Sequence, residues 1–148
     1  SYPGRPRYRE TPMFRTLSCI ALLVACAGAS AQQTPAEALE DYVGGLRNGD
    51  TAQLLRVLHS AGQVCFQSGP TRPAPTCESF ASAAPRWTAT ADPNAHGKVL
   101  HQHDATPTMS TITYELHVRN THFIDQFLMY RIDGRWWIMA KNTEIVPD

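Results

Sequence analysis

Three polar side chains late in the chain have the residue types that proton-transfer chemistry requires. Asp125 could act as a general base, Tyr114 could donate a hydrogen bond to a developing oxyanion, and Asn142 could orient a substrate or the carboxylate. Burying a carboxylate on an apolar wall is costly unless it is paired, and an unpaired buried carboxylate gains affinity for protons. The alternative is that the three side chains satisfy one another as a buried network without contacting a ligand.

The histidines are a second set of candidate ligands. His101 and His103 share one face of a predicted strand, and pairing of two later strands would bring His117 close to His122. Imidazole is a frequent zinc ligand, but a zinc site needs a third ligand, and no cysteine or glutamate is obviously placed to supply one. We therefore predict no metal ligands among them. His59 is expected to end a helix.

A predicted hairpin would place Asp125 beside Asn142. The strand-like runs 121–132 and 135–145 are separated by Asp133-Gly134, a pair that favours a two-residue type I′ turn. This turn fixes the register of the two strands and puts Asp125 opposite Asn142.

A second two-residue turn is predicted at Arg119-Asn120, which would add the strand 109–118 and place Tyr114 opposite Asp125. The apolar residues of both hairpins then fall on one face of a three-stranded sheet. From this face we predict that a ligand would contact Ile112, Leu116, Phe123, Phe127 and Trp136, together with Asn142. Met129, Ile138 and Ala140 would complete the apolar wall.

The opposite face of the same sheet is also rich in apolar side chains. Leu128, Tyr130, Trp137 and Met139 point to this side in the predicted register. Such a cluster is too apolar for a freely solvated surface, so we predict a homodimer through this outer face.

Helical signals precede the strands. Thr34-Pro-Ala-Glu37 is a capping box that begins a helix, which should stop near Asn48-Gly49. Asp50 is expected to cap a second short helix that reaches about His59. Short strands are expected at 63–67 and 99–105, a third short helix that begins after Thr76 and runs through Phe80, and a loop over 85–97 in which Trp87 is partly buried.

The first 31 residues resemble an upstream extension and a signal peptide. Met13-Phe-Arg15 is a basic start, Leu17 to Ala25 is a short apolar core, and Ala29-Ser-Ala31 is a small-residue cleavage site. This predicts a periplasmic or secreted protein whose mature domain covers residues 32–148. The alternative is lipidation at Cys26, which would make a membrane-anchored lipoprotein.

Charge and cysteine content restrict the classes of partner. Residues 1–31 hold four of the 13 Lys and Arg and one of the 13 Asp and Glu, so residues 32–148 have a net charge of −3. No basic stripe remains for a nucleic acid, which we exclude as a partner. Cys65 and Cys77 are either bridged or two separate buried thiols. No glycine-rich phosphate loop or nucleophile elbow is present, and we predict no cofactor.

The ending Phe-x-Asp-x-Phe-Leu-x-x-x-Ile-Asp-Gly-x-Trp-x-Ile, from Phe123 to Ile138, and the helical opening over 36–59 resemble the nuclear transport factor 2-like (NTF2-like) superfamily. Within it, the chain is most similar to the SnoaL-like and "putative lumazine-binding" group. The resemblance implies an α+β cone, in which helices pack on a strongly curved antiparallel sheet and enclose a pocket. It implies little about chemistry, because this scaffold hosts isomerases, cyclases, dehydratases and pure binders.

These observations favour an exported protein whose apolar pocket binds a small apolar or aromatic molecule. One alternative is a cofactor-free isomerase or dehydratase with Asp125 as general base and Tyr114 as electrophilic partner. Another is a non-catalytic dimerisation or accessory module.

Overall fold

The computed structural model describes residues 34–67 and 74–147. Within these ranges the chain forms three helices and six strands, in the order α1 (Pro35–Asn48), α2 (Thr51–Leu55), β1 (Leu58–Gln67), β2 (Thr76–Ser79), α3 (Phe80–Trp87), β3 (His96–Thr106), β4 (Met109–Val118), β5 (Thr121–Ile132) and β6 (Arg135–Ile145). The predicted signal peptide within residues 1–31 lies outside the described residues. None of the described helices has the length and hydrophobicity needed to span a bilayer.

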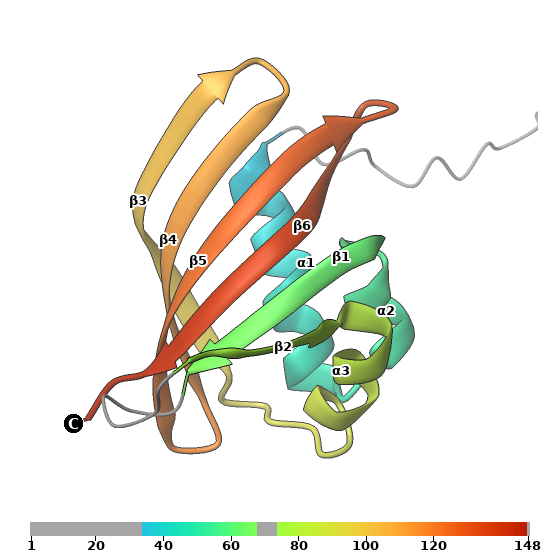
Figure 1. Ribbon diagram of the computed structural model, residues 1–148. Helices are drawn as coiled ribbons and strands as arrows, with labels where there is room; N and C mark the ends of the chain where they lie inside the picture. Colours follow the sequence, from blue (N-terminus) through green and yellow to red (C-terminus); the bar gives the residue numbers. More distant parts are fainter. Residues whose placement is uncertain (1–33, 68–73, 148) are drawn as a thin grey trace, which may run out of the picture.

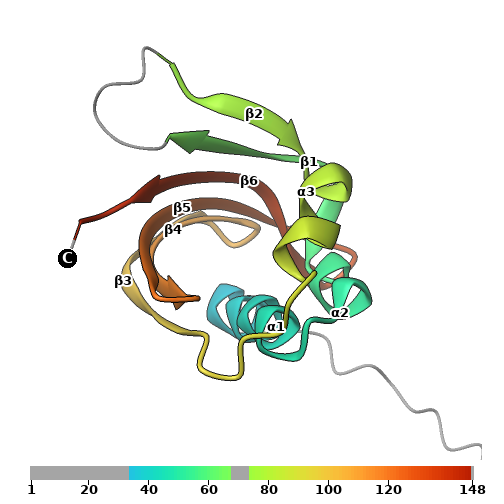
Figure 2. The ribbon, with the colours of Figure 1, turned by 90° about the horizontal axis from the view of Figure 1, so that it is seen from below.

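The six strands form one sheet in the order β2-β1-β6-β5-β4-β3. Neighbouring strands are antiparallel except β1 and β6, which run parallel, so the sheet is mixed. Figure 1 shows its strong curvature, and Figure 2 shows β3, β4 and β5 curling around α1. The expected α+β fold with helices against a curved sheet is confirmed.

The predicted ends of α1 are confirmed. Thr34 and Glu37 form both hydrogen bonds of the capping box, and Gly49 ends the helix in the left-handed conformation at φ 63°. Asp50 accepts a hydrogen bond from the backbone of Gln53 and so caps α2 as expected.

Two other helix predictions are wrong. The second helix ends at Leu55, and His59 lies in β1, because the backbone of Val57 accepts a sheet hydrogen bond from Ile138. The segment from Thr76 forms β2, and α3 begins only at Phe80. Short runs of this kind fit the period of a helix or of a strand, and pairing with another strand decides the outcome: β6 for the first segment and β1 for the second.

Of the two alternatives for Cys65 and Cys77, a bridge or two separate thiols, the structure contains the bridge. Cys65 on β1 and Cys77 on β2 are directly opposite each other, with Cα atoms 4.0 Å apart, and their sulfurs are bonded. The bridge joins the two strands at one end of the sheet.

The hairpin at Arg119-Asn120 has the predicted register. Both residues have positive φ angles, 51° and 59°, and Tyr114 lies opposite Asp125. Asp133-Gly134 likewise has positive φ angles, and its first pairs match the prediction as far as Met129 opposite Ile138.

The predicted pairing of Asp125 with Asn142 is wrong by one residue. After Ile138 the register shifts, so that Ala140 lies opposite Leu128 and Asp125 lies opposite Thr143. Met139 is the extra residue of a β-bulge, which exchanges the faces of all residues that follow it. Asn142 is therefore exposed on the outer face, opposite Gln126, and Lys141 points inward.

Gly62 explains how the sheet accommodates this bulge. The pairing of β1 with β6 is irregular between Leu58 and Gln63, next to Met139. A Cβ atom at Gly62 would lie 2.7 Å from the Met139 carbonyl oxygen and 2.6 Å from the Phe80 ring. The bulge thus depends on a close backbone approach that only glycine allows.

The hydrophobic core lies between the helices and the inner sheet face. Its buried members include Leu39, Tyr42, Val43, Leu54, Leu58, Phe80, Ile112, Tyr114, Phe127, Met129, Trp136 and Ile138. Among the described residues, two charged side chains, Asp125 and Lys141, are buried with them.

Candidate functional site

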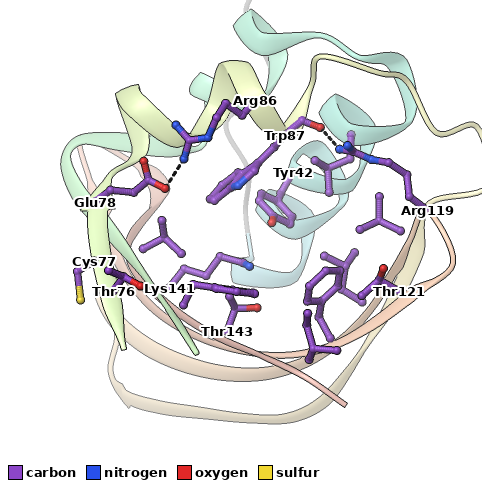
Figure 3. Close-up of a pocket in the computed structure, with 17 residues that line it drawn as sticks. Tyr42, Thr76, Cys77, Glu78, Arg86, Trp87, Arg119, Thr121, Lys141 and Thr143 are labelled. Atoms are coloured by element: carbon purple, nitrogen blue, oxygen red, sulfur yellow. Dashed lines mark hydrogen bonds and ion pairs between the residues drawn. The ribbon is translucent and has the colours of Figure 1, made fainter. Parts of the chain in front are cut away.

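A cavity of about 590 Å³ opens between α1, α3 and the end of the sheet away from the Asp133-Gly134 turn (Figure 3). This volume suits a small organic molecule. Its walls come from both helices, five strands and one turn, and comprise Tyr42, Leu46, Val64, Phe66, Thr76, Cys77, Glu78, Arg86, Trp87, Leu116, Val118, Arg119, Thr121, Phe123, Lys141, Thr143 and Ile145.

Aromatic and aliphatic side chains form most of this wall. Tyr42 projects from the buried face of α1, and Trp87 is the last residue of α3. Their rings meet edge to face with centroids 6.4 Å apart, and Phe123 lines the wall from β5. Such a surface favours a flat apolar or aromatic ligand.

Lys141 is a charged group on this mostly apolar wall. The bulge turns its side chain inward, and its ammonium lies 2.8 Å from Oδ1 of Asp125. The side chains are only 5% and 0% exposed. Figure 3 shows the Lys141 side chain extending into the cavity toward Tyr42 and Trp87.

Three aromatic rings surround the ammonium of Lys141. The nitrogen lies 5.3 Å from the ring centroid of Trp87, 5.9 Å from that of Phe127 and 6.0 Å from that of Tyr42. These distances allow cation–π attraction, which is stronger in a desolvated site. The aromatic rings and the carboxylate together offset the desolvation of the charge.

Asp125 is held by its neighbours on β6. Its Oδ1 also accepts a hydrogen bond from the Thr143 hydroxyl, whereas Oδ2 has no hydrogen-bond partner among the described residues. The predicted network of Asp125 with Tyr114 and Asn142 does not form. An ion pair with Lys141 takes its place, and Asp125 is not part of the cavity wall.

Tyr114 lies buried across the strand from Asp125. Its hydroxyl has no hydrogen-bond partner within residues 34–67 and 74–147. Burial, followed by the charge of Glu40, raises the pKa of Tyr114 to about 12. Burial also raises the pKa of Tyr42, with smaller contributions from Asp125 and Tyr114. Both phenols therefore remain protonated at neutral pH, as potential hydrogen-bond donors.

The predicted ligand-binding side chains are divided between three environments. Leu116 and Phe123 line the cavity. Ile112, Phe127 and Trp136 are buried in the core, and Phe127 reaches the site through its contacts with Lys141 and Tyr42. Asn142 lies on the other side of the sheet, in a shallow outer depression beside Gln126.

Charged side chains mark the rim of the cavity. Arg86 pairs with Glu78, and the Arg119 guanidinium donates to the Trp87 carbonyl oxygen, as the dashed lines in Figure 3 show. The hydrogen bond from Arg86 lowers the pKa of Glu78, which therefore stays ionised. With Lys141, the described residues of the wall carry three cationic groups and one anionic group, a balance that favours ligands bearing acceptors or negative charge.

Sequence reasoning missed Lys141, which the predicted register placed on the outer face. Asp125 could have pointed to Lys141, because a buried carboxylate needs a cation and Lys141 is close to it on the neighbouring strand. Tyr42 and Trp87 were recognised only as buried residues, since nothing in the sequence indicates that their rings meet.

The histidines take two different positions. His101 and His103 are exposed on β3. His117 lies opposite His122, as predicted, but the expectation that no glutamate is near them is wrong. Glu115 precedes His117 by two residues on the same face, and its Oε1 lies 3.2 Å from Nε2 of His117.

Comparison with known proteins supports the fold and the family. A protein of unknown function described as NTF2-like from Shewanella baltica OS155 superposes with a TM-score of 0.66 at 15% identity, over 76% of this chain and 91% of that chain. A similar protein from Methylobacillus flagellatus KT gives 0.64 at 18% identity, over 76% and 89%. A ketosteroid isomerase-like protein from Erwinia carotovora atroseptica SCRI1043 gives 0.56 at 10% identity, over 76% and 94%.

At these identities the solved structures establish the fold alone. A search of curated proteins found no significant match. The profile of the family described as "Putative lumazine-binding" matches residues 30–142, which span most of the chain. The chain therefore belongs to the "Putative lumazine-binding" family and has the NTF2-like fold.

Proposed function

We propose that the protein binds a small, flat aromatic molecule in the cavity, and that Lys141 donates a hydrogen bond to an acceptor or anionic group of that molecule. The observation that carries this proposal is the inward position of Lys141 on an otherwise largely apolar wall. An ammonium has three protons to donate, and the Asp125 contact uses one of them. A ligand acceptor beside Trp87 could accept another.

The family description supports a ligand of this kind. Lumazine is a planar heteroaromatic bicycle with carbonyl acceptors, so it combines a face for stacking with edges for hydrogen bonds. Tyr42, Trp87 and Phe123 supply the apolar contacts, and Lys141 supplies a donor. Lumazine is accordingly the probe with which to begin.

Calorimetric titration of the purified protein with lumazine tests the proposal. We expect one molecule to bind per chain, and Thr121→Trp, which places a large ring at the cavity wall, to abolish binding. Thr111→Trp is the matched control, because Thr111 is exposed on the same hairpin and is not part of the cavity wall. Undiminished binding by Thr121→Trp would show that the ligand binds at another site.

The isomerase or dehydratase alternative is less well supported. A general base must reach its substrate, but Asp125 is fully buried, is paired with Lys141 and does not line the cavity.

We also propose that the protein is exported. The Cys65–Cys77 bridge supports this, because disulfides persist mainly in oxidising compartments, and so does the signal-like pattern of residues 1–31. The intact mass of the protein from its own host should fit a chain that begins at Gln32 or at a lipidated Cys26. Retention of Met13, or two free thiols in non-reducing peptide maps, would contradict export.

Finally, we propose a homodimer through the outer sheet face. Leu128, Trp137 and Met139 are half-buried there, and Tyr130 is 37% exposed. Arg135 and His59 contact the Trp137 ring but leave part of it accessible. A second copy of the same face would bury this apolar surface.

A further inference from the structure

A cluster of potential metal ligands lies on the outer face near the β4–β5 turn. Glu115 and His117 are two residues apart on β4, and His122 is directly opposite His117 on β5. Side chains directly opposite each other, and on the diagonal, are within reach across two strands. The cluster therefore follows from the register set by Arg119-Asn120.

The distances between the donor atoms are close to those of a coordinated ion. Glu115 Oε1 lies 3.2 Å from His117 Nε2, Glu115 Oε2 lies 3.9 Å from His122 Nε2, and the potential ligand atoms of all three residues lie within 4.8 Å of one another. Two ligands about 2.1 Å from a tetrahedral ion are separated by about 3.4 Å. Small side-chain rotations are enough to reach that spacing.

His122 gives a second and independent indication. Its Nε2 is buried and has no hydrogen-bond partner in the described part of the chain. A buried ring nitrogen without a partner is unfavourable, and a metal ion would satisfy it. The carboxylate of Glu115 faces this nitrogen from the neighbouring strand.

The histidine rings of the cluster lie in a stack. His117 stacks between His122 and His96, with ring centroids 4.5 Å and 4.9 Å apart. Lys98 lies 3.3 Å from Glu115 and is mostly exposed, so an incoming divalent ion can displace it at little cost. Because the His117 and His122 rings are nearly parallel, one of them must rotate for both nitrogens to point at the same ion.

We propose that Glu115, His117 and His122 bind a divalent transition-metal ion, with Zn²⁺ as the best match to two imidazoles and one carboxylate. Three protein ligands leave one position of a tetrahedral site for water or another ligand. This site lies on the outer sheet face, and none of its residues lines the cavity. It can therefore be tested separately from the proposed binding of an aromatic molecule.

The test is calorimetric titration of the full chain with Zn²⁺, after treatment with a chelator, together with NMR spectra of the imidazole nitrogens. We expect one ion to bind per chain and to shift the NMR signals of His117 and His122. The affinity should be weakened by more than about tenfold in Glu115→Gln and His122→Ala. His101→Ala is the control, because His101 is exposed on β3 outside the cluster. It should bind as the unmodified chain does.

Glu115→Gln preserves the size of the side chain, and circular dichroism would confirm that each variant is folded. No binding by the unmodified chain would overturn the proposal. Equal binding by Glu115→Gln, His122→Ala and His101→Ala would overturn it too, since that result describes an adventitious ion only.

Discussion

The ammonium of Lys141 lies 2.8 Å from the carboxylate of Asp125, and both side chains are buried beneath the aromatic rings of the cavity. Asp125 lies directly opposite Thr143, so Lys141 reaches it on the diagonal between β5 and β6. One extra residue, Met139, makes this contact possible. Without the bulge, Asn142 would point inward and the carboxylate would lack its cation.

The first prediction concerns the stability of this pair. Asp125→Asn leaves a buried ammonium without its counter-ion and should lower the free energy of unfolding by about 3 to 5 kcal/mol. Lys141→Met should have a similar cost, and combining both changes should cost less than their sum. Urea denaturation measures all three. Lys98→Met, at an exposed pair, is the control and should change stability by less than about 1 kcal/mol.

An unchanged unfolding midpoint for Asp125→Asn would contradict the buried ion pair. It would instead indicate that the Asp125 carboxylate is accessible to a ligand, as the isomerase or dehydratase alternative requires.

The second prediction concerns the unpartnered hydroxyl of Tyr114. Tyr114→Phe removes a buried polar atom, so stability should be unchanged or should rise by about 1 kcal/mol. The raised pKa means that the folded chain holds this proton more tightly than the unfolded chain does. The contribution of this proton to the free energy of unfolding is therefore fully present below about pH 10. It is lost as the pH rises through about 12.

Denaturation at several alkaline pH values tests this slope, which should be shallower in Tyr114→Phe. Tyr130→Phe, at a 37% exposed position, is the matched control. Marked destabilisation by Tyr114→Phe at neutral pH would show that the hydroxyl has a structural partner.

The third prediction concerns the bulge. Gly62→Ala places a methyl group against the Met139 carbonyl and the Phe80 ring, and should cost about 1 to 3 kcal/mol through overpacking. Gly44→Ala is the control, because the nearest atoms there belong to the flexible Gln53 side chain. If both variants melt at the same temperature, the close approach at Gly62 is not required.

The fourth prediction concerns self-association. Trp137→Glu would place a charge in the proposed contact between two outer faces and should convert dimers into monomers, as measured by sedimentation velocity. Gln126→Glu adds a charge at an exposed position of the same sheet and should leave more of the dimer intact. A monomeric unmodified chain at high concentration would remove the premise.

Local signals in the sequence predicted much of this fold. The Thr34–Glu37 capping box gave the start of α1, and the Arg119-Asn120 turn gave the register of β4 with β5. In each case residues next to one another in the sequence determine the geometry.

Contacts between distant segments account for what could not be predicted. The bulge at Met139 depends on β1, which runs parallel to β6 and brings Gly62 against it, and no turn signal reports such a pairing. The bulge exchanged the faces of Lys141 and Asn142 relative to the prediction. As a result, the polar group in the candidate site is Lys141 and not Asn142. Thr76–Ser79 is a strand because it pairs with β1, the strand that precedes it, beside the disulfide.

The role of Lys141 in ligand binding can be tested by native mass spectrometry. The unmodified protein from its own host is compared with the doubly substituted Asp125→Asn, Lys141→Met chain. The double substitution removes both charges, and circular dichroism verifies its fold. We predict that the unmodified chain carries one small aromatic molecule and that the folded double variant has lost it. Retention of the same molecule by the double variant would contradict the role of Lys141, and an unmodified chain that neither carries a ligand nor binds lumazine would contradict the proposed function.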